Sequence, residues 1–135
     1  GATVLTGGEV VDRDGSFYAP TVISGVVAGS DILREEIFGP VLSIITFTDE
    51  ADAVAKANDT EYGLVSYAFT QDLARGQRLI ESLHTGMMGL NVGVVSNAAA
   101  PFGGVKQSGV GREGGFEGIH EYLETKYVLT PNPFA

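Results

Sequence analysis

The chain has 135 residues, 44% hydrophobic and 19% charged, a composition typical of a globular domain with a core and not of a disordered segment. Its 17 acidic residues outnumber 8 basic ones, for a net charge of -9, so no basic surplus is available to bind nucleic acid or an anionic membrane. The absence of a long apolar run excludes a membrane span, and the absence of cysteine excludes disulfides and thiolate metal sites while mildly favouring a cytoplasmic location.

The first 47 residues predict three short strands. Residues 4–6 form an apolar run closed by Gly7 and Gly8, and residues 17–22 read as a second strand, reached through a turn at Asp14-Gly15. Pro20 interrupts this second run, which places it at an edge or at a strand start. Residues 41–47 are almost all β-branched or apolar, which predicts a buried strand.

Residues 49–95 alternate between helix and strand patterns. Acidic residues at 49–52 begin a helix that runs to Asn58, because carboxylates are favoured near helix N-termini. A strand over 64–70, a helix over 72–83 and a strand over 87–95 follow. In the second helix, leucine and isoleucine at 73, 79, 80 and 83 face inward, and Gly76 weakens the helix by roughly 1 kcal/mol relative to alanine. The alternation predicts a parallel sheet with crossover helices.

The last third is rich in glycine. Glycines gather at 86–93 and 103–118, which predicts turns and loops there. A short helix over 116–122 and a strand over 123–129 are expected next, followed by a loose tail to residue 135.

The stretch Arg34-Glu35-Glu36-Ile37-Phe38-Gly39-Pro40-Val41 places two acids and an aromatic before the third strand. If its backbone is extended, Glu36 and Phe38 point to one side, because side chains alternate with period two. A carboxylate beside a flat ring suits a ligand with hydroxyls and a planar ring, such as a nucleotide. The alternative is a strand entry with solvated acids.

A second long motif reads Pro101-Phe102-Gly103-Gly104-Val105-Lys106-Gln107-Ser108-Gly109-Val110-Gly111-Arg112-Glu113. Together the two motifs resemble signatures of the NAD(P)-dependent aldehyde dehydrogenases, in order and in spacing. The similarity runs from residue 1 to about 129 and covers about the last quarter of such an enzyme. It implies an α/β fold in which residues 1–122 are the C-terminal part of the catalytic domain, with a mainly parallel twisted sheet. Residues 123–135 would be a C-terminal oligomerisation strand and tail, joining subunits into a homodimer or homotetramer.

The resemblance also implies roles for the first motif. Glu36 would take the ribose hydroxyls next to the nicotinamide of NAD or NADP, and Phe38 would pack by the nicotinamide ring. The family's reaction needs a thiolate nucleophile, and both that cysteine and the activating glutamate lie upstream of the motifs seen here. The chain therefore looks like a C-terminal piece without catalytic residues of its own, and we expect it to be inactive alone.

Two further candidates concern the substrate. The stretch 93–97 resembles the succinate-semialdehyde dehydrogenase branch, in which Ser96 would hold the distal carboxylate of the aldehyde substrate. The alternatives are a serine that caps a local turn, and an enzyme for an uncharged or amino aldehyde, since three alanines at 98–100 depart from the branch. Phe102 matches an aromatic near the family's substrate tunnel, with a core ring as the alternative.

The stretch Gly109-Val110-Gly111-Arg112-Glu113-Gly114 spells the G-x-G-x-x-G dinucleotide pattern, but it follows no apolar strand and no acid lies about twenty residues on. The glycines more plausibly form a tight loop, with Lys106 and Arg112 pinning backbone carbonyls or acids. His84 and His120 have no partners at metal-ligand spacing and are expected at the surface. A different class of function stays open as well, that of a non-catalytic folding or assembly module with exposed strand edges.

Overall fold

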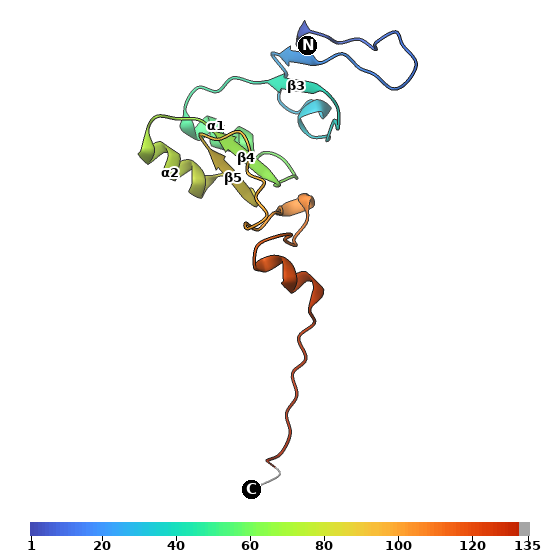
Figure 1. Cartoon of the computed structure of the whole chain (residues 1–135). Helices are drawn as coiled ribbons and strands as arrows, with labels where there is room; N and C mark the ends of the chain where they lie inside the picture. The colour runs from blue at the N-terminus through green and yellow to red at the C-terminus, as the bar shows by residue number, and fades with distance from the viewer. Residues whose placement is uncertain (133–135) are drawn as a thin grey trace. The chain divides into compact units, whose positions relative to one another are not determined.

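The computed structural model describes residues 1–132, and the chain divides between Glu61 and Tyr62 into two compact units (Figure 1). Each unit combines short strands with one α-helix, so the expected α/β class is confirmed. The boundary expected at 122/123 stays a prediction.

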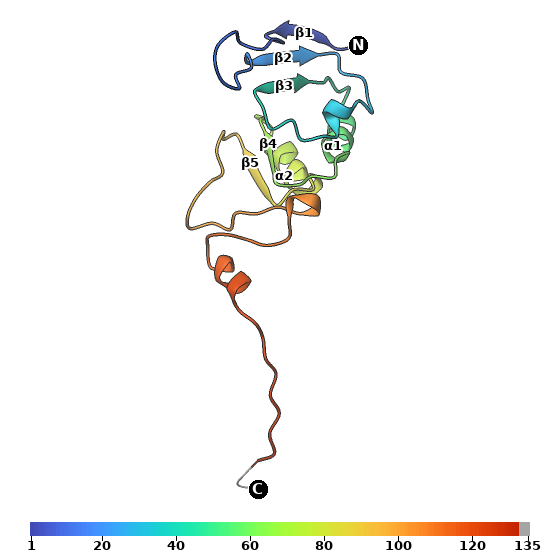
Figure 2. The ribbon, with the colours of Figure 1, turned by 90° about the vertical axis from the view of Figure 1, so that its right-hand side faces the viewer.

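The first unit is built on a three-stranded sheet in the order β1 (Thr3–Thr6), β2 (Thr21–Ser24) and β3 (Val41–Ile44) (Figure 2). Strand β1 pairs with β2 antiparallel, whereas β2 and β3 run parallel, with Thr21 opposite Val41. The predicted second strand begins later than expected because Pro20 has no N–H to pair; the ladder starts at Thr21, whose N–H donates to the Pro40 carbonyl at 2.8 Å.

Helix α1 (Glu50–Asn58) follows β3 and is fastened at its start. The Asp49 carboxylate accepts from the Asp52 N–H, which is the expected N-cap. Asp52 in turn accepts from the Lys56 ammonium at 2.7 Å and from the Thr48 N–H at 2.9 Å, and these bonds lower the pKa of the Asp52 carboxyl below its ordinary value. Lys56 also donates to the Thr46 carbonyl at 2.9 Å, so the helix is tied to the segment that leaves β3.

The second unit contains β4 (Val65–Ala68), α2 (Leu73–Ser82) and β5 (Met87–Leu90), with β4 and β5 parallel. Asp72 caps α2, and the bond from the Arg75 N–H lowers the pKa of the Asp72 carboxyl. The predicted helix–strand alternation is confirmed, but the prediction of one sheet over 41–95 is wrong. Within residues 1–132, β3 pairs with β2 in the first unit, and β4 pairs with β5 alone.

Helix α2 meets β5 through a glycine (Figure 1). Gly76 is buried, and a Cβ on it would come within 2.9 Å of the Leu90 Cδ2 atom. This close approach explains why a residue that weakens the helix stands there. The prediction that Leu73 and Ile80 face inward is wrong, since their side chains are 83% and 45% exposed.

Two short 3-10 helices follow, η2 (Lys106–Ser108) and η3 (Glu117–Tyr122), the latter at the place of the predicted short helix. Residues 123–132 contain no strand, which contradicts the strand expected over 123–129. A strand exists only as part of a hydrogen-bonded ladder, and the described chain offers this segment no neighbour. Residues 133–135 of the expected tail lie outside the described residues.

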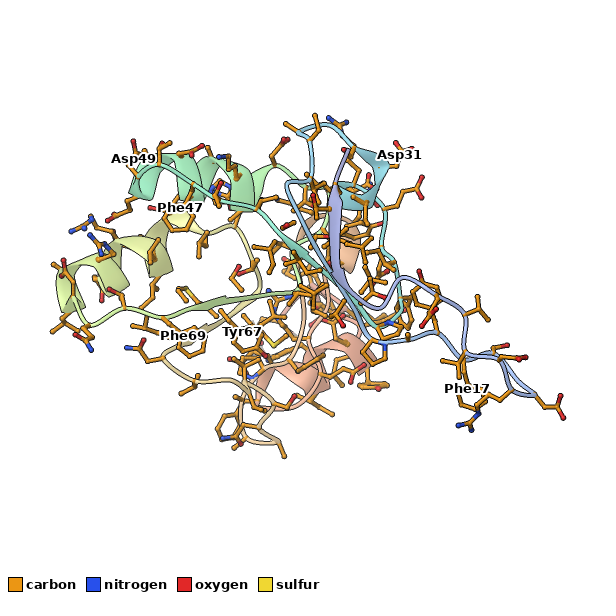
Figure 3. The ribbon with its side chains drawn as sticks, turned by 90° about the horizontal axis from the view of Figure 1, so that it is seen from above. Phe17, Asp31, Phe47, Asp49, Tyr67 and Phe69 are labelled. Carbon is orange, nitrogen blue, oxygen red and sulfur yellow. The ribbon has the colours of Figure 1, made fainter. Side chains whose placement is uncertain are left out.

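One face of the β4–β5 pair is apolar and open. Tyr67 and Phe69 are 44% and 71% exposed, and Figure 3 shows both rings on the side of β4 away from α2. The Tyr67 ring lies over Gly89 of β5, where a Cβ would come within 2.7 Å of the ring. Parallel strands are normally covered on both faces, so a cover is missing from this unit. The core is correspondingly small: within residues 1–132, Ile23 of the first unit is the only large apolar side chain that is buried, and it is still 6% exposed.

Candidate functional site

Glu36 and Phe38 lie in the loop between η1 (Asp31–Leu33) and β3. The 3-10 turn ends where the Arg34 and Glu35 N–H groups donate to the Asp31 carbonyl, at 2.8 and 2.7 Å. Phe38 has a φ of +50°, in the left-handed region. The expectation of an extended backbone is therefore wrong at Phe38, and the period-two argument that placed Glu36 and Phe38 on one side loses its basis.

The cause is the Gly39-Pro40 pair that follows. The Val41 N–H folds back onto the Gly39 carbonyl at 2.8 Å, and the Pro40 carbonyl is held by the Thr21 N–H. The chain must turn sharply into β3, and Phe38 takes the left-handed conformation just before that turn. Such a conformation costs a bulky residue about 1–3 kcal/mol, and strained residues of this kind cluster at active sites, ligand clamps and switch regions.

Both side chains of this loop are available to a ligand. The Phe38 ring is 93% exposed, and the Glu36 side chain is also exposed. Among residues 1–132, no cation pairs with the Glu36 carboxylate. An acceptor-only carboxylate and an open ring are the groups expected to hold a nucleoside.

The first unit also has a groove of about 770 Å³ at the carboxyl ends of β2 and β3, the usual ligand position in open α/β sheets. Neither Glu36 nor Phe38 lines it. Its lining combines apolar side chains with two cations and an acid, among them Leu33, Arg34, Ile44, Lys56 and Asp59.

In the second unit, Ser96 lies in the loop that follows β5. Its side chain is exposed, and no group within residues 1–132 pairs with its hydroxyl. The turn-capping role expected as the alternative for Ser96 belongs to its neighbour: the Asn97 Oδ1 atom accepts from the Ala99 N–H at 2.9 Å. The sequence pattern places Asn97 beside Ser96 after the apolar strand but does not by itself assign the turn to Asn97, although an asparagine two positions before a possible donor is a known turn signal.

Phe102 lines a groove of about 710 Å³ and is 37% exposed, so it is not a sealed core ring. Its backbone exchanges two hydrogen bonds of 2.7 Å with Glu113. Other side chains of the groove wall are Ser108, Arg112, Ile119, Glu121 and Tyr122. Ser96 does not line this groove, so the structure does not bring the two expected substrate contacts together in one cavity.

The glycine-rich segment forms a tight loop in which Arg112 binds backbone carbonyls, as predicted. The guanidinium Nη1 of Arg112 donates to the Gly104 carbonyl at 2.6 Å and to the Gly111 carbonyl at 2.9 Å. A Cβ on Gly103 would lie 2.3 Å from the Gly111 carbonyl oxygen, so the two backbones approach as only glycine allows. The glycines therefore serve close packing between loops.

The two histidines lie at the surface, as predicted. His84 and His120 are both exposed. No cluster of three His, Asp or Glu side chains suited to a metal ion occurs within residues 1–132, and no helix in that range is long and apolar enough to span a bilayer.

Comparison with known proteins assigns the chain to a family. The aldehyde dehydrogenase family profile matches residues 1–128. The chain is 53% identical over 134 residues to a succinate-semialdehyde dehydrogenase of Paenarthrobacter nicotinovorans, covering 99% of this chain and 30% of that protein. It is 48% identical over 128 residues to the NADP(+) succinate-semialdehyde dehydrogenase GabD of Escherichia coli strain K12, covering 95% of this chain and 27% of that protein.

A solved structure of similar fold is betaine aldehyde dehydrogenase of Staphylococcus aureus in complex with NAD+, as a point mutant with a modified cysteine. It is 43% identical with a TM-score of 0.89, over 96% of this chain and 27% of that one. The chain thus spans less than a third of the length of the relatives it matches. Its two motifs, its α/β architecture and the match of nearly its whole length show that it belongs to the aldehyde dehydrogenase family.

Proposed function

We propose that this chain supplies the nicotinamide-riboside contact and part of the substrate site of an NAD(P)-dependent dehydrogenase for succinate semialdehyde. The observation that carries the proposal is the loop before β3, in which the exposed Glu36 carboxylate precedes the exposed Phe38 ring and the Phe38 backbone is left-handed. The surrounding turn fixes this conformation, so the loop is shaped before any ligand arrives.

The residues of the loop fit a nicotinamide nucleotide. Glu36 can accept from both hydroxyls of a ribose, and Phe38 offers an apolar surface to a planar ring. When bound, the cofactor supplies a hydride acceptor, and the chain's own part is to hold and orient it. Support for NADP comes from the relative of E. coli, and support for NAD from the S. aureus structure, so the proposal includes both forms.

On the substrate side, we assign Ser96 to the distal carboxylate. Its hydroxyl is exposed and has no partner within residues 1–132, so it can donate a hydrogen bond to an anion without breaking another bond. Phe102, on the wall of the groove in the same unit, is proposed to contact the apolar part of the aldehyde.

The test uses an intact enzyme, here called the hybrid enzyme, in which this chain replaces the 27% of E. coli GabD that it matches. Replacing Ser96 with alanine should raise KM for succinate semialdehyde about tenfold, the effect of losing a hydrogen bond to a charged group. KM for butanal, which lacks the carboxylate, should stay within about twofold. Steady-state kinetics on both aldehydes measure this, and equal effects on the two would show that Ser96 is structural.

A second function is favoured by a separate observation, the large exposed apolar surface. Side chains that would fill a core are open to solvent in both units, including Leu42, Phe47, Phe69, Tyr127 and Leu129. We infer that the chain is also an assembly module whose segment 123–129 joins another copy into a homodimer or homotetramer. Leu123, Thr125, Tyr127 and Leu129 share one face of that segment, and three of the four are apolar, which suits an added strand.

For the isolated chain we expect association that grows with concentration, because uncovered parallel strands and exposed aromatics are stabilised by burial. Sedimentation velocity over a hundredfold concentration range should show the mean mass rising above the monomer value of 14.1 kDa. A chain ending at residue 122 serves as the control and should associate less. A concentration-independent monomer would contradict this second function, while cofactor titration of the same samples tests the first.

A further inference from the structure

The segment that carries Ser96 is anchored on its C-terminal side. Asn97 begins a tight turn in which its Oδ1 atom accepts from the Ala99 N–H at 2.9 Å and its carbonyl accepts from the Ala100 N–H at 3.0 Å. An asparagine side chain that bonds the backbone two residues on fixes its own backbone direction. The direction in which the chain leaves Ser96 is therefore set at Asn97.

The Asn97 turn is held by the end of the second motif and the glycines that follow it. The Ala98 carbonyl accepts from the Gly115 N–H at 3.2 Å, and the backbones of Phe102 and Glu113 exchange two hydrogen bonds. Gly114 and Gly115 have φ values of +67° and +57°, and a Cβ on Gly115 would lie 3.0 Å from the Pro101 nitrogen. The loop from 98 to 102, which follows the Asn97 turn, is therefore held against residues 113–115 by backbone hydrogen bonds and close packing.

Ser96 itself lacks such support. It is exposed, its hydroxyl has no partner within residues 1–132, and regular strand β5 ends at Leu90, six positions earlier. The nearest contact along the chain that restrains it is the Asn97 side chain. An unrestrained serine would lose conformational freedom on binding an anion, and that loss weakens binding.

We propose that Asn97 is a positioning residue, which holds the Ser96 hydroxyl where it meets the distal carboxylate of the aldehyde. The inference rests on the proposed role of Ser96 and adds a residue to it. Asn97 touches neither the substrate nor the cofactor; its amide acts through the backbone turn. Its effect is therefore confined to carboxylated substrates and to substrate binding.

Two substitutions in the hybrid enzyme test this. Asn97→Ala removes the acceptor and should raise KM for succinate semialdehyde about three- to tenfold, the effect of losing one ordinary hydrogen bond, with kcat within about twofold. Asn97→Ser keeps an oxygen that can accept from the Ala99 N–H, so KM should return to within about twofold of the parent. Catalysis with butanal should be unchanged in both. Gln107→Ala, which removes another exposed amide of the same unit, is the matched control and should leave all values unchanged.

The outcomes separate the two assignments. If Ser96→Ala raises KM for succinate semialdehyde but Asn97→Ala does not, the role of Asn97 is overturned and that of Ser96 stands. Equal losses with both aldehydes in Asn97→Ala, or failure of Asn97→Ser to restore KM, would show a general structural role and overturn the proposal. If Ser96→Ala itself leaves KM unchanged, both assignments are overturned.

Discussion

The purified 135-residue chain is expected to form no NADH or NADPH with any aldehyde. It contains no cysteine, so it has no thiolate to attack the aldehyde carbonyl and carry the acyl group. The expected rate is that of the buffer alone, measured by absorbance of the reduced nicotinamide with both cofactors.

The hybrid enzyme supplies the positive control for that result. It joins this chain to the remaining part of the E. coli relative, and at 48% identity most of the packing between the two parts should be preserved. We expect the hybrid to oxidise succinate semialdehyde within about tenfold of the parent enzyme's kcat/KM. Turnover by the isolated chain that survives further purification would refute the requirement for a thiolate from elsewhere.

The elements with local signals could be predicted from the sequence. Asp49 and Asp72 stand directly before their helices, and each side chain accepts the expected backbone N–H. The arrangement of strands could not be predicted to the same degree, because pairing depends on contacts between distant residues. The run from 41 to 47 has a strand pattern throughout, yet only its first four residues find a partner, in β2.

The same difference between local signals and contacts made only in the fold explains which parts of the candidate site could be predicted. The residue types around Glu36 and Phe38 predict a nucleotide contact, but they do not determine the backbone, which turns at Gly39-Pro40 and is left-handed at Phe38. The prediction that Arg112 pins backbone carbonyls is confirmed, because its guanidinium donates to the carbonyls of Gly104 and Gly111. The turn at Asn97 could not be assigned to that residue from the sequence alone, because Ser96 beside it is an equally good turn-capping residue and the structure decides between them.

Replacing Glu36 with glutamine in the hybrid enzyme is expected to slow hydride transfer about 10- to 100-fold and to weaken cofactor affinity, with little change in stability. Glutamine has nearly the same shape, but its amide nitrogen donates, so it accepts fewer hydrogen bonds from a ribose diol than a carboxylate does. Bonds to a charged acceptor are the stronger kind, which sets the size of the effect. Stability should be unaffected because Glu36 is exposed and has no ion-pair partner within residues 1–132.

The neighbouring acid provides a matched control. Glu35 is also exposed and carries the same charge, but it stands one position earlier, at the end of the 3-10 turn, where its N–H is bonded to the Asp31 carbonyl. Glu35→Gln removes the same charge from the same loop and should leave hydride transfer within about twofold, as single-turnover measurements with both cofactors would show. If the two variants slow the reaction equally, the loop acts through its net charge and not through a carboxylate held at Glu36. If neither slows it, the strained conformation of Phe38 has a structural cause and the nucleotide assignment of this loop fails.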